Sequence, residues 1–400
     1  MKKLLILFLS LIISGNCTIS NDPESSSFST SYEHKKTICL NMIVKDESPV
    51  IRRSLASVKN IIDYWVIVDT GSTDGTQQII KEFMKDIPGE LHERPWVNFG
   101  HNRDEALKLA KNKGDYLLFI DADEELFFSP EFKLPFLDQD YYYSILKIHT
   151  STCHRKLLVN NHLNWEWKGI VHEQLLCPEA TTFSLLSGIV NSAEATDGHR
   201  SEDPLKYLKD AKELEAALEK DPNNIRNIFY LAQSYLKSHD YASALKNHEK
   251  VLSMKSSEIE LYPSLYNIGI LSELLNLDSE KIINSYTQAA QNSPSRIEPL
   301  FRLAVYYFGK NNYLQSYALA KQALIIHNPH ERLYNEDWIY DYGILFAFGN
   351  AALSLNKPEE ALLAYEQALE FPQLPKEMAQ EIQQNLMTAR LKMQELKLIK

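Results

Sequence analysis

Two carboxylates separated by a single residue, Asp121 and Asp123, directly follow an apolar run. That run, residues 116–120, has the length and composition of a buried strand. A tight turn after such a strand brings the two carboxylates close enough to share one divalent cation, which prefers hard oxygen ligands. A cation held there neutralises the charge that develops on a departing diphosphate. Because acidic surface turns carry the same triplet, the triplet alone does not establish the site.

A third carboxylate, Asp69, follows another apolar run at residues 64–68. In a parallel sheet the carboxyl ends of the strands meet at one edge, and ligands bind beyond that edge. A carboxylate in this place can accept hydrogen bonds from a nucleobase or a ribose. A well-capped turn is the simpler alternative. We therefore predict that Asp69 and Asp121 face one crevice, with Asp69 more consistent with ligand binding than with turn formation alone.

An aromatic stretch later in the chain ends in His172 and Glu173. A neutral imidazole can complete the coordination of a metal held by carboxylates. A glutamate in an apolar pocket can act as the general base on an acceptor hydroxyl, and Trp167 can stack on the apolar face of a sugar. A core hairpin with a satisfied histidine is the alternative interpretation of the stretch. Glu124 and Glu125 are alternative bases.

The elements that must position these residues alternate between strand and helix patterns. Short apolar, β-branched runs predict strands, and segments with helical spacing of apolar residues separate them. Such alternation indicates an α/β domain with a mainly parallel, Rossmann-like sheet covered by helices on both faces. The predicted strands are 38–44, 64–68, 91–93 and 116–120, and the predicted helices include 77–84 and 102–111.

From about residue 203 the pattern changes to helices only, and similar segments recur. Small residues return at intervals close to the roughly 34-residue period of tetratricopeptide repeats. Each repeat is a helix pair that buries its apolar face only by stacking on its neighbours. The repeats are expected either to bind a protein partner or to give structural support. The recurring small residues are Ala232, Gly269, Ala304 and Gly349.

Four segments resemble, in order and spacing, the motifs of family 2 glycosyltransferases. They are Asn41–Glu47, Asp69–Thr76, His101–Leu107 and Asp121–Glu124. The resemblance covers about residues 37 to 200, and a subgroup of that family also carries tetratricopeptide repeats. It implies a GT-A fold, a nucleoside-diphosphate sugar donor, a divalent metal such as Mn²⁺ or Mg²⁺, and usually inversion at the anomeric carbon.

The resemblance also implies roles for individual residues. Asp69 would read the base, while Asp121 and Asp123 would serve the ribose, the metal and the diphosphate. Lys45 and Glu47 would line the nucleotide pocket. By the same matching positions, Asn102 and Arg103 would lie near the diphosphate. Together with the chemistry of the residues described above, the predicted site has Trp167 at the substrate, Glu173 and Asp123 in catalysis, and Asp121, Asp123 and His172 as metal ligands.

The start of the chain has the character of a targeting segment. A basic Met1–Lys3 precedes the apolar run 4–13, which is too short for an ordinary spanning helix. We predict a signal peptide or short membrane anchor at 1–17 and a polar linker at 18–36. The glycosyltransferase domain would then be 37–202 and the repeats 203–400. Because nucleotide sugars are usually cytosolic, membrane association at the cytosolic face is an alternative to export.

Composition limits the possible functions. The chain has 400 residues, of which 44% are hydrophobic, and a net charge of −11. The acidic balance argues against a general nucleic-acid binder, which needs a basic face. The expected partners are a nucleotide-sugar donor, a protein, lipid or glycan acceptor, and a protein partner on the repeats. An inactive scaffold of the same fold is the main alternative. A nucleotidyltransferase would need a Gly-rich basic loop, which residues 41–47 do not supply.

Overall fold

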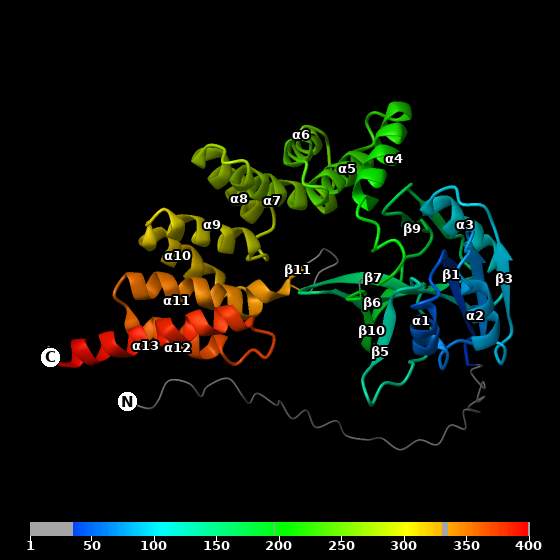
Figure 1. Cartoon of the computed structure of the whole chain (residues 1–400), viewed down its shortest axis with the longest axis horizontal. Coiled ribbons are helices and arrows are strands. Elements are labelled where there is room, and N and C mark those ends of the chain that lie inside the picture. The colour runs from blue at the N-terminus through cyan, green and yellow to red at the C-terminus, as the bar shows by residue number, and fades with distance from the viewer. Residues whose placement is uncertain (1–34, 196, 330–334, 399–400) are drawn as a thin grey trace, which may run out of the picture. The chain divides into compact units, whose positions relative to one another are not determined.

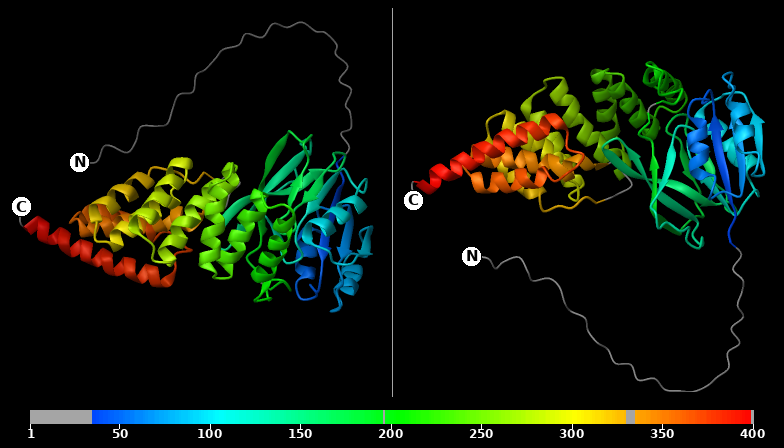
Figure 2. Two further views of the ribbon diagram at one scale, coloured as in Figure 1. Left: turned by 90° about the horizontal axis from the view of Figure 1, so that it is seen from above. Right: turned by 60° about the horizontal axis from the view of Figure 1, so that its bottom comes forward.

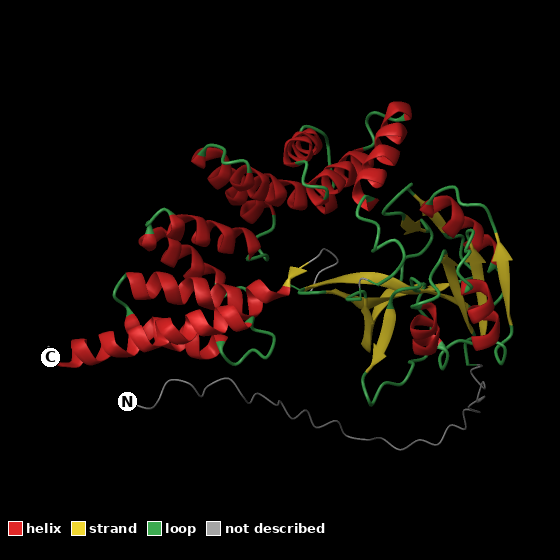
Figure 3. Cartoon of the chain, viewed as in Figure 1, coloured by secondary structure: helices red, strands yellow, loops and turns green. Residues whose placement is uncertain are grey.

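The computed structural model describes residues 35–195, 197–329 and 335–398. The predicted signal segment 1–17, and all of the predicted linker except its last two residues, lie outside the described residues. No helix among the described residues is long and apolar enough to cross a membrane. The N-terminal part contains both strands and helices, whereas nearly all elements of the C-terminal part are helices (Figures 1 and 3).

The first half of the sheet is parallel, as the sequence predicts. Its strands lie in the order β3-β2-β1-β4. All four predicted strands are present, and the first has the predicted bounds. Helix α3 begins three residues before the expected start. The elements are β1 (Ile38–Val44), α1 (Ile51–Val58), β2 (Tyr64–Asp69), α2 (Thr76–Phe83), β3 (Gly89–Glu93), α3 (Phe99–Leu109) and β4 (Tyr116–Phe119).

The second half of the sheet is mixed. Strand β7 is antiparallel to β4 and to β6, and β10 continues the sheet as a parallel neighbour of β6. Strand β5 closes the edge, antiparallel to β10. A separate hairpin joins β8 and β9. The bounds are β5 (Glu125–Phe128), β6 (Tyr141–Ile148), β7 (Ser151–Asn160), β8 (Glu166–Lys168), β9 (Gln174–Leu176) and β10 (Phe183–Ser192).

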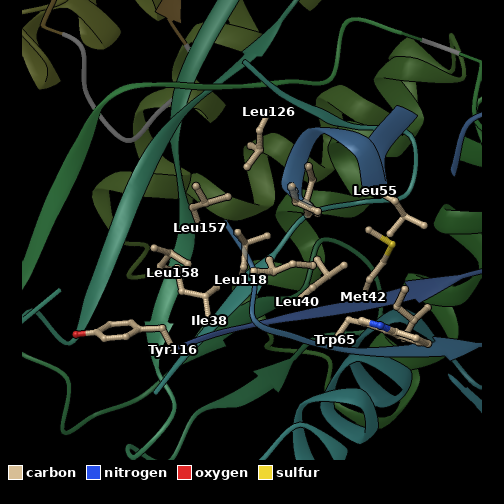
Figure 4. Packing of buried hydrophobic residues seen from close by; sticks show 14 of the residues in the cluster. Ile38, Leu40, Met42, Leu55, Trp65, Tyr116, Leu118, Leu126, Leu157 and Leu158 are labelled. Carbon is tan, nitrogen blue, oxygen red and sulfur yellow. The ribbon is translucent and has the colours of Figure 1, made fainter. Parts of the chain in front are cut away.

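Alternation along β1 explains how both faces of the sheet are covered. Successive strand side chains point to opposite faces. Ile38, Leu40 and Met42 pack into the cluster that contains Leu55 of α1, and Figure 4 shows these side chains together. Cys39 faces the other way, into a cluster with residues of α3 and of the β8–β9 hairpin. The sheet is therefore covered on both faces.

The register of the parallel strands brings the candidate residues to one edge. Val44, the last residue of β1, pairs with Asp69, the last residue of β2. Asn41 of β1 pairs with Phe119 at the end of β4, so Asp121 follows at the same edge. The predicted placement of Asp69 and Asp121 at one edge of the sheet, at the ends of the two strands that flank β1, is confirmed.

The C-terminal part consists of tetratricopeptide-like helix pairs. Each helix from α4 to α13 contacts the next one in the chain, and Figure 2 shows the pairs stacked in sequence order. The helices are α4 (Lys206–Lys220), α5 (Ile225–Lys237), α6 (Tyr241–Leu252), α7 (Glu258–Leu274), α8 (Ser279–Asn292), α9 (Glu298–Gly309), α10 (Tyr313–Ala323), the π-helical turn Ile339–Gly343, α11 (Ile344–Ser354), α12 (Pro358–Ala368) and α13 (Lys376–Leu398).

The recurring small residues lie where helices approach closely. Ala232 and Ala304 are fully buried. A β-carbon on Gly269 would overlap the ring of Tyr286, and one on Gly349 would lie 2.5 Å from the ring of Tyr365. In both cases the tyrosine belongs to the following helix of the pair. The small residues therefore leave room for an aromatic side chain, as the repeat pattern predicts.

One element departs from the expected all-helical pattern. Strand β11 (Asn335–Glu336) pairs antiparallel with residues Ser151–Thr152 of β7 in the sheet. Glu336 also accepts hydrogen bonds from Tyr266 of α7 and from Arg302 of α9, whose Nη2 lies 3.1 Å away. Strand β11 thus links two repeat helices to the sheet. A two-residue strand has no periodicity from which it could be predicted.

We predict that Gly349→Val destabilises the repeats by about 1–3 kcal/mol, because the added side chain must displace the Tyr365 ring. Chemical denaturation of the full chain measures the change. Gly309→Val is the matched control, since a β-carbon at Gly309 meets no atom within 4 Å. Equal effects of the two substitutions would show that Gly349 is not required for this helix contact.

Candidate active site

A cavity of about 880 Å³ opens beyond the strand ends. One wall comes from the sheet edge and α3, another from the loop after β8, and a third from α4 and α5. Its volume lies within the range of ordinary ligand sites. Predicted site residues that line it are Lys45, Glu47, Arg103, Asp121, Asp123, Trp167, His172 and Glu173.

Asp121 is held between two arginines. Arg155 of β7 donates from Nη2 to Asp121 Oδ2 at 2.9 Å, and Arg103 of α3 pairs with the other carboxylate oxygen. Burial by itself raises the pKa of Asp121, but the two guanidinium groups hold it well below its usual value. Asp121 is therefore an ionised carboxylate whose two oxygens are both engaged by cations.

Glu124 completes the same charge cluster from the sheet side. It is buried, accepts from Asn191 Nδ2 at 2.8 Å and from the Asp121 backbone amide at 3.1 Å, and also pairs with Arg155. Burial raises the pKa of Glu124. It does not line the cavity, and neither does Glu125, which lies 3.8 Å from Arg53. Because neither side chain lines the cavity, the structure does not favour Glu124 or Glu125 as the general base.

Arg103 connects Asp121 to Glu173. Its Nε donates to Glu173 Oε1 at 2.6 Å, and both side chains are about nine-tenths buried. The guanidinium carbon of Arg103 also lies 5.3 Å from the ring centre of Trp167, a cation–π distance. Arg103, Glu173 and Trp167 therefore form one packed group beside Asp121.

Two glycines permit this arrangement. Gly169 has a φ of 116°, in the left-handed region that only glycine adopts without strain. A β-carbon on Gly100 of α3 would overlap the Gly169 carbonyl oxygen, so glycine is needed for the loop to approach the helix. The loop Gly169–Glu173 reaches the cavity because of this close contact.

Asp123 and Glu47 are carboxyl groups of the cavity that no cationic side chain pairs with directly in the part of the chain that the structure describes. Among the described residues, neither carboxylate forms an ion pair. Burial raises the pKa of Asp123, and the neighbouring Asp121 raises it further. Burial also raises the pKa of Glu47 to about 7, although a 3.2 Å hydrogen bond from the His199 amide acts to lower it. A cation bound beside these two groups would be favourable.

Asp69 is placed differently from the lining residues. It is buried, and its Oδ2 accepts from the amides of Gly71 and Ser72 and from Gln77 Nε2 at 2.7 Å. Its Oδ1 is buried and has no hydrogen-bond partner in the part of the chain that the structure describes. Thr70, the next residue, lines the cavity. Asp69 shapes the turn and keeps one acceptor unsatisfied.

Asn102 does not line the cavity, in contrast to the sequence-based expectation. It is fully buried, and its side chain accepts from the Val97 amide at 2.9 Å and donates to the Pro95 carbonyl at 3.0 Å. Neighbouring residues on a helix point about 100° apart. Arg103 therefore points to the cavity, while Asn102 holds the loop before α3.

The three predicted metal ligands are not assembled as a set. Within residues 35–195, 197–329 and 335–398, no group of three or more His, Cys, Asp and Glu side chains is arranged to hold a metal. Asp121 is taken by the arginines. His172 stacks on Tyr230 with ring centres 4.3 Å apart. Asp123 is the predicted ligand that remains available.

Some important residues escaped the sequence analysis. Arg155 reaches Asp121 only because β7 pairs antiparallel with β4, and no local motif marks it. Arg226 and Tyr230 line the cavity from α5. Nothing in their local sequence distinguishes them from other residues of a repeat helix. His199 and Arg200, in the segment before the repeats, also line the cavity.

Comparison with known proteins is consistent with this geometry. Residues 39–146 match the model of the family described as Glycosyl transferase family 2. A 90-residue segment is 40% identical to a TPR repeat-containing protein of Synechococcus elongatus, and covers 22% of this chain and 21% of that protein. A 91-residue segment is 38% identical to an uncharacterized glycosyltransferase of Rickettsia prowazekii, and covers 23% and 29%. The matches thus span less than a third of either relative.

Among solved structures, the crystal structure of MamA aligns with 41% of this chain and 88% of its own, at 14% identity and a TM-score of 0.35. The family 2 glycosyltransferase match thus lies within the N-terminal α/β part, and tetratricopeptide-like helix pairs follow it.

We predict that Arg155→Gln destabilises the protein by about 3 kcal/mol, because Glu124 and Asp121 lose a shared cation inside the protein. Chemical denaturation compares it with Arg94→Gln. Arg94 forms a half-exposed pair with Glu105 at 2.8 Å, and its loss is expected to cost less than about 1 kcal/mol. A small and equal effect of both substitutions would contradict the assigned importance of the Asp121 cluster.

Proposed function

We propose that this protein is a glycosyltransferase that moves a sugar from a nucleoside-diphosphate sugar to an acceptor. The observation that carries the proposal is the cavity at the strand ends, where Arg103 and Arg155 fix Asp121 while Asp123 stays unpaired among the described residues. The family 2 domain supports the reaction class. The acceptor is a protein, a lipid or a glycan.

The donor would bind with its nucleoside toward β1 and β2. Asp69 Oδ1, which is buried and has no hydrogen-bond partner among the described residues, would accept a hydrogen bond from an N–H of the base. The turn after Asp69 would have to shift to let the base reach this atom. Leaving such an atom unsatisfied costs free energy, which a bound nucleobase would recover. Lys45 and Glu47 line the adjoining wall. The diphosphate would lie near Arg103, whose guanidinium faces the cavity beside Asp121.

The residues present fit a divalent cation such as Mn²⁺ or Mg²⁺ at Asp123. Its carboxylate is a hard oxygen ligand, and Glu47 lines the same cavity, where a bound cation would favour its ionised form. Asp121 would not bind the cation directly, because both its carboxylate oxygens pair with arginine. It would instead hold Arg103 and Arg155 in place beside the cation. When bound, the cation would stabilise negative charge on the leaving diphosphate.

Glu173 is the proposed general base. It lines the cavity at the end of the glycine loop, and Arg103 fixes the direction of its carboxylate. The acceptor hydroxyl would give its proton to Glu173 as its oxygen attacks the anomeric carbon. The bond to the diphosphate breaks on the opposite side, so the configuration inverts. Trp167, beside Arg103, would contact the sugar.

We further propose that the protein works in association with a membrane or after export. The basic and apolar start of the chain supports this, and anchoring at a cytosolic face would keep the enzyme near its donor.

We predict that Asp123→Ala lowers turnover roughly 100-fold or more, since one group that stabilises the leaving diphosphate is lost. The assay is nucleoside-diphosphate release from a panel of nucleotide sugars with Mn²⁺. Asp278→Ala is the matched control, because this carboxylate precedes α8 and makes no capping hydrogen bond. Full activity of Asp123→Ala would refute the assignment. Absence of turnover and of nucleotide binding in the unaltered protein would favour an inactive scaffold.

A further inference from the structure

The first two helices of the C-terminal part, α4 and α5, form a wall of the candidate active site. Helix α4 contributes Tyr207, Asp210 and Glu213 to the lining of the cavity, and α5 contributes Arg226 and Tyr230. The cavity that holds Asp121 and Asp123 is therefore incomplete without the repeat region. This placement raises the question of what the two α5 residues do there.

Arg226 contacts the backbone of His172, and Tyr230 contacts its side chain. Arg226 Nη2 donates to the His172 carbonyl oxygen at 2.7 Å, and the Tyr230 ring stacks on the imidazole at an interplanar angle of 15°. Arg226 also lies over the Tyr230 ring at 4.6 Å and donates to its hydroxyl at 3.2 Å. The three residues form one interlocked unit.

The loop Gly169–Glu173, which contains His172, also packs into an apolar cluster with helices α4 and α5. Val171 is buried against Ala211 and Leu214 of α4 and Leu231 of α5. Phe99 of α3 packs against this cluster as well. A loop that contacts a helix through both a buried side chain and a backbone carbonyl has few alternative positions.

The loop needs such support because its backbone is strained. His172 has a φ of 53°, a left-handed conformation that costs a non-glycine residue of order 1 kcal/mol or more. Gly169, three residues earlier, adds flexibility. The hydrogen bond and the ring stack from α5 stabilise the strained conformation at the position directly before Glu173.

A continuous series of contacts follows. Arg226 holds His172, the next residue Glu173 pairs with Arg103, and Arg103 pairs with Asp121. Among the described residues, Arg226 forms no ion pair with a carboxylate, whereas its cavity neighbours Arg200 and Lys209 pair with Asp210 and Asp203. The guanidinium of Arg226 is thus committed to the loop and to Tyr230.

We propose that Arg226 and Tyr230 are positioning residues, through which helix α5 sets the direction of Glu173. The proposal builds on the proposed function, because it concerns the base of that reaction. It assigns the first helices of the C-terminal part, α4 and α5, to the active site itself, in addition to any role of the repeats in binding a partner. The functional unit then extends past residue 202 to include α4 and α5.

The test compares full-length Arg226→Gln, Arg226→Lys and the unaltered protein. Arg226→Gln is expected to lower kcat at least tenfold, because a displaced base loses its alignment, while calorimetry with UDP or GDP and Mn²⁺ gives an unchanged Kd. Arg226→Lys, which keeps a donor for the His172 carbonyl, should recover part of kcat. Arg390→Gln, a loss of an exposed pair with Glu366 in α12, is the matched control.

Tyr230→Leu and Tyr230→Phe provide a second pair should Arg226→Gln fail to fold. Leucine removes the ring stack and is expected to lower kcat, whereas phenylalanine keeps the stack and should retain most of it. Unchanged kcat in both Arg226→Gln and Tyr230→Leu would overturn the proposal, as would a matching loss of nucleotide affinity.

Hydrogen exchange separates this proposal from the proposed function. Amides of residues 169–173 should exchange faster in Arg226→Gln than in the unaltered protein, whether or not the protein turns over a donor. Unchanged exchange in this loop would refute the positioning role even if transfer is confirmed.

Discussion

The engagement of Asp121 by two arginines is the interaction on which the site depends. A carboxylate in this place is stable as an anion only because Arg103 and Arg155 compensate it. The two cations come from different elements, α3 and β7, and each also holds a second carboxylate. One charge cluster therefore sets the relative positions of a helix, an antiparallel strand, the turn after β4 and the loop after β8.

This cluster also explains the different states of the two carboxylates in the triplet. Asp121 is neutralised and fixed, whereas Asp123 stays unpaired among the described residues, with a raised pKa. Arg53 donates to the Asp123 backbone carbonyl at 3.1 Å and not to its side chain. Gly198 makes room for that carboxylate, since a β-carbon there would lie 2.6 Å from its Oδ2. The triplet thus divides into one carboxylate that two arginines hold and one that we propose as the cation ligand.

Much of the parallel sheet could be predicted from sequence, because its strands are short apolar runs and their ends carry the polar residues. On this basis the sequence places Asp69 and Asp121 at one edge of the sheet, as the structure confirms, but the expectation that both face one crevice is not met, because Asp69 does not line the cavity. Contacts made by the antiparallel strands and the repeats could not be predicted, because they depend on pairing between distant segments. Arg155 and Tyr230 belong to this class. Asn102 and Arg103 show a further limit: a motif identifies both residues, but only the rotation of α3 decides which one faces the cavity.

The most direct test of the account is calorimetric titration of the full chain with nucleoside diphosphates in the presence of Mn²⁺. The account predicts saturable binding of at least one of UDP and GDP at one site per chain, weakened when Mn²⁺ is replaced by a chelator and in Asp69→Asn. No binding of any nucleoside diphosphate, with the chain folded, would contradict the assignment of the cavity as a donor site.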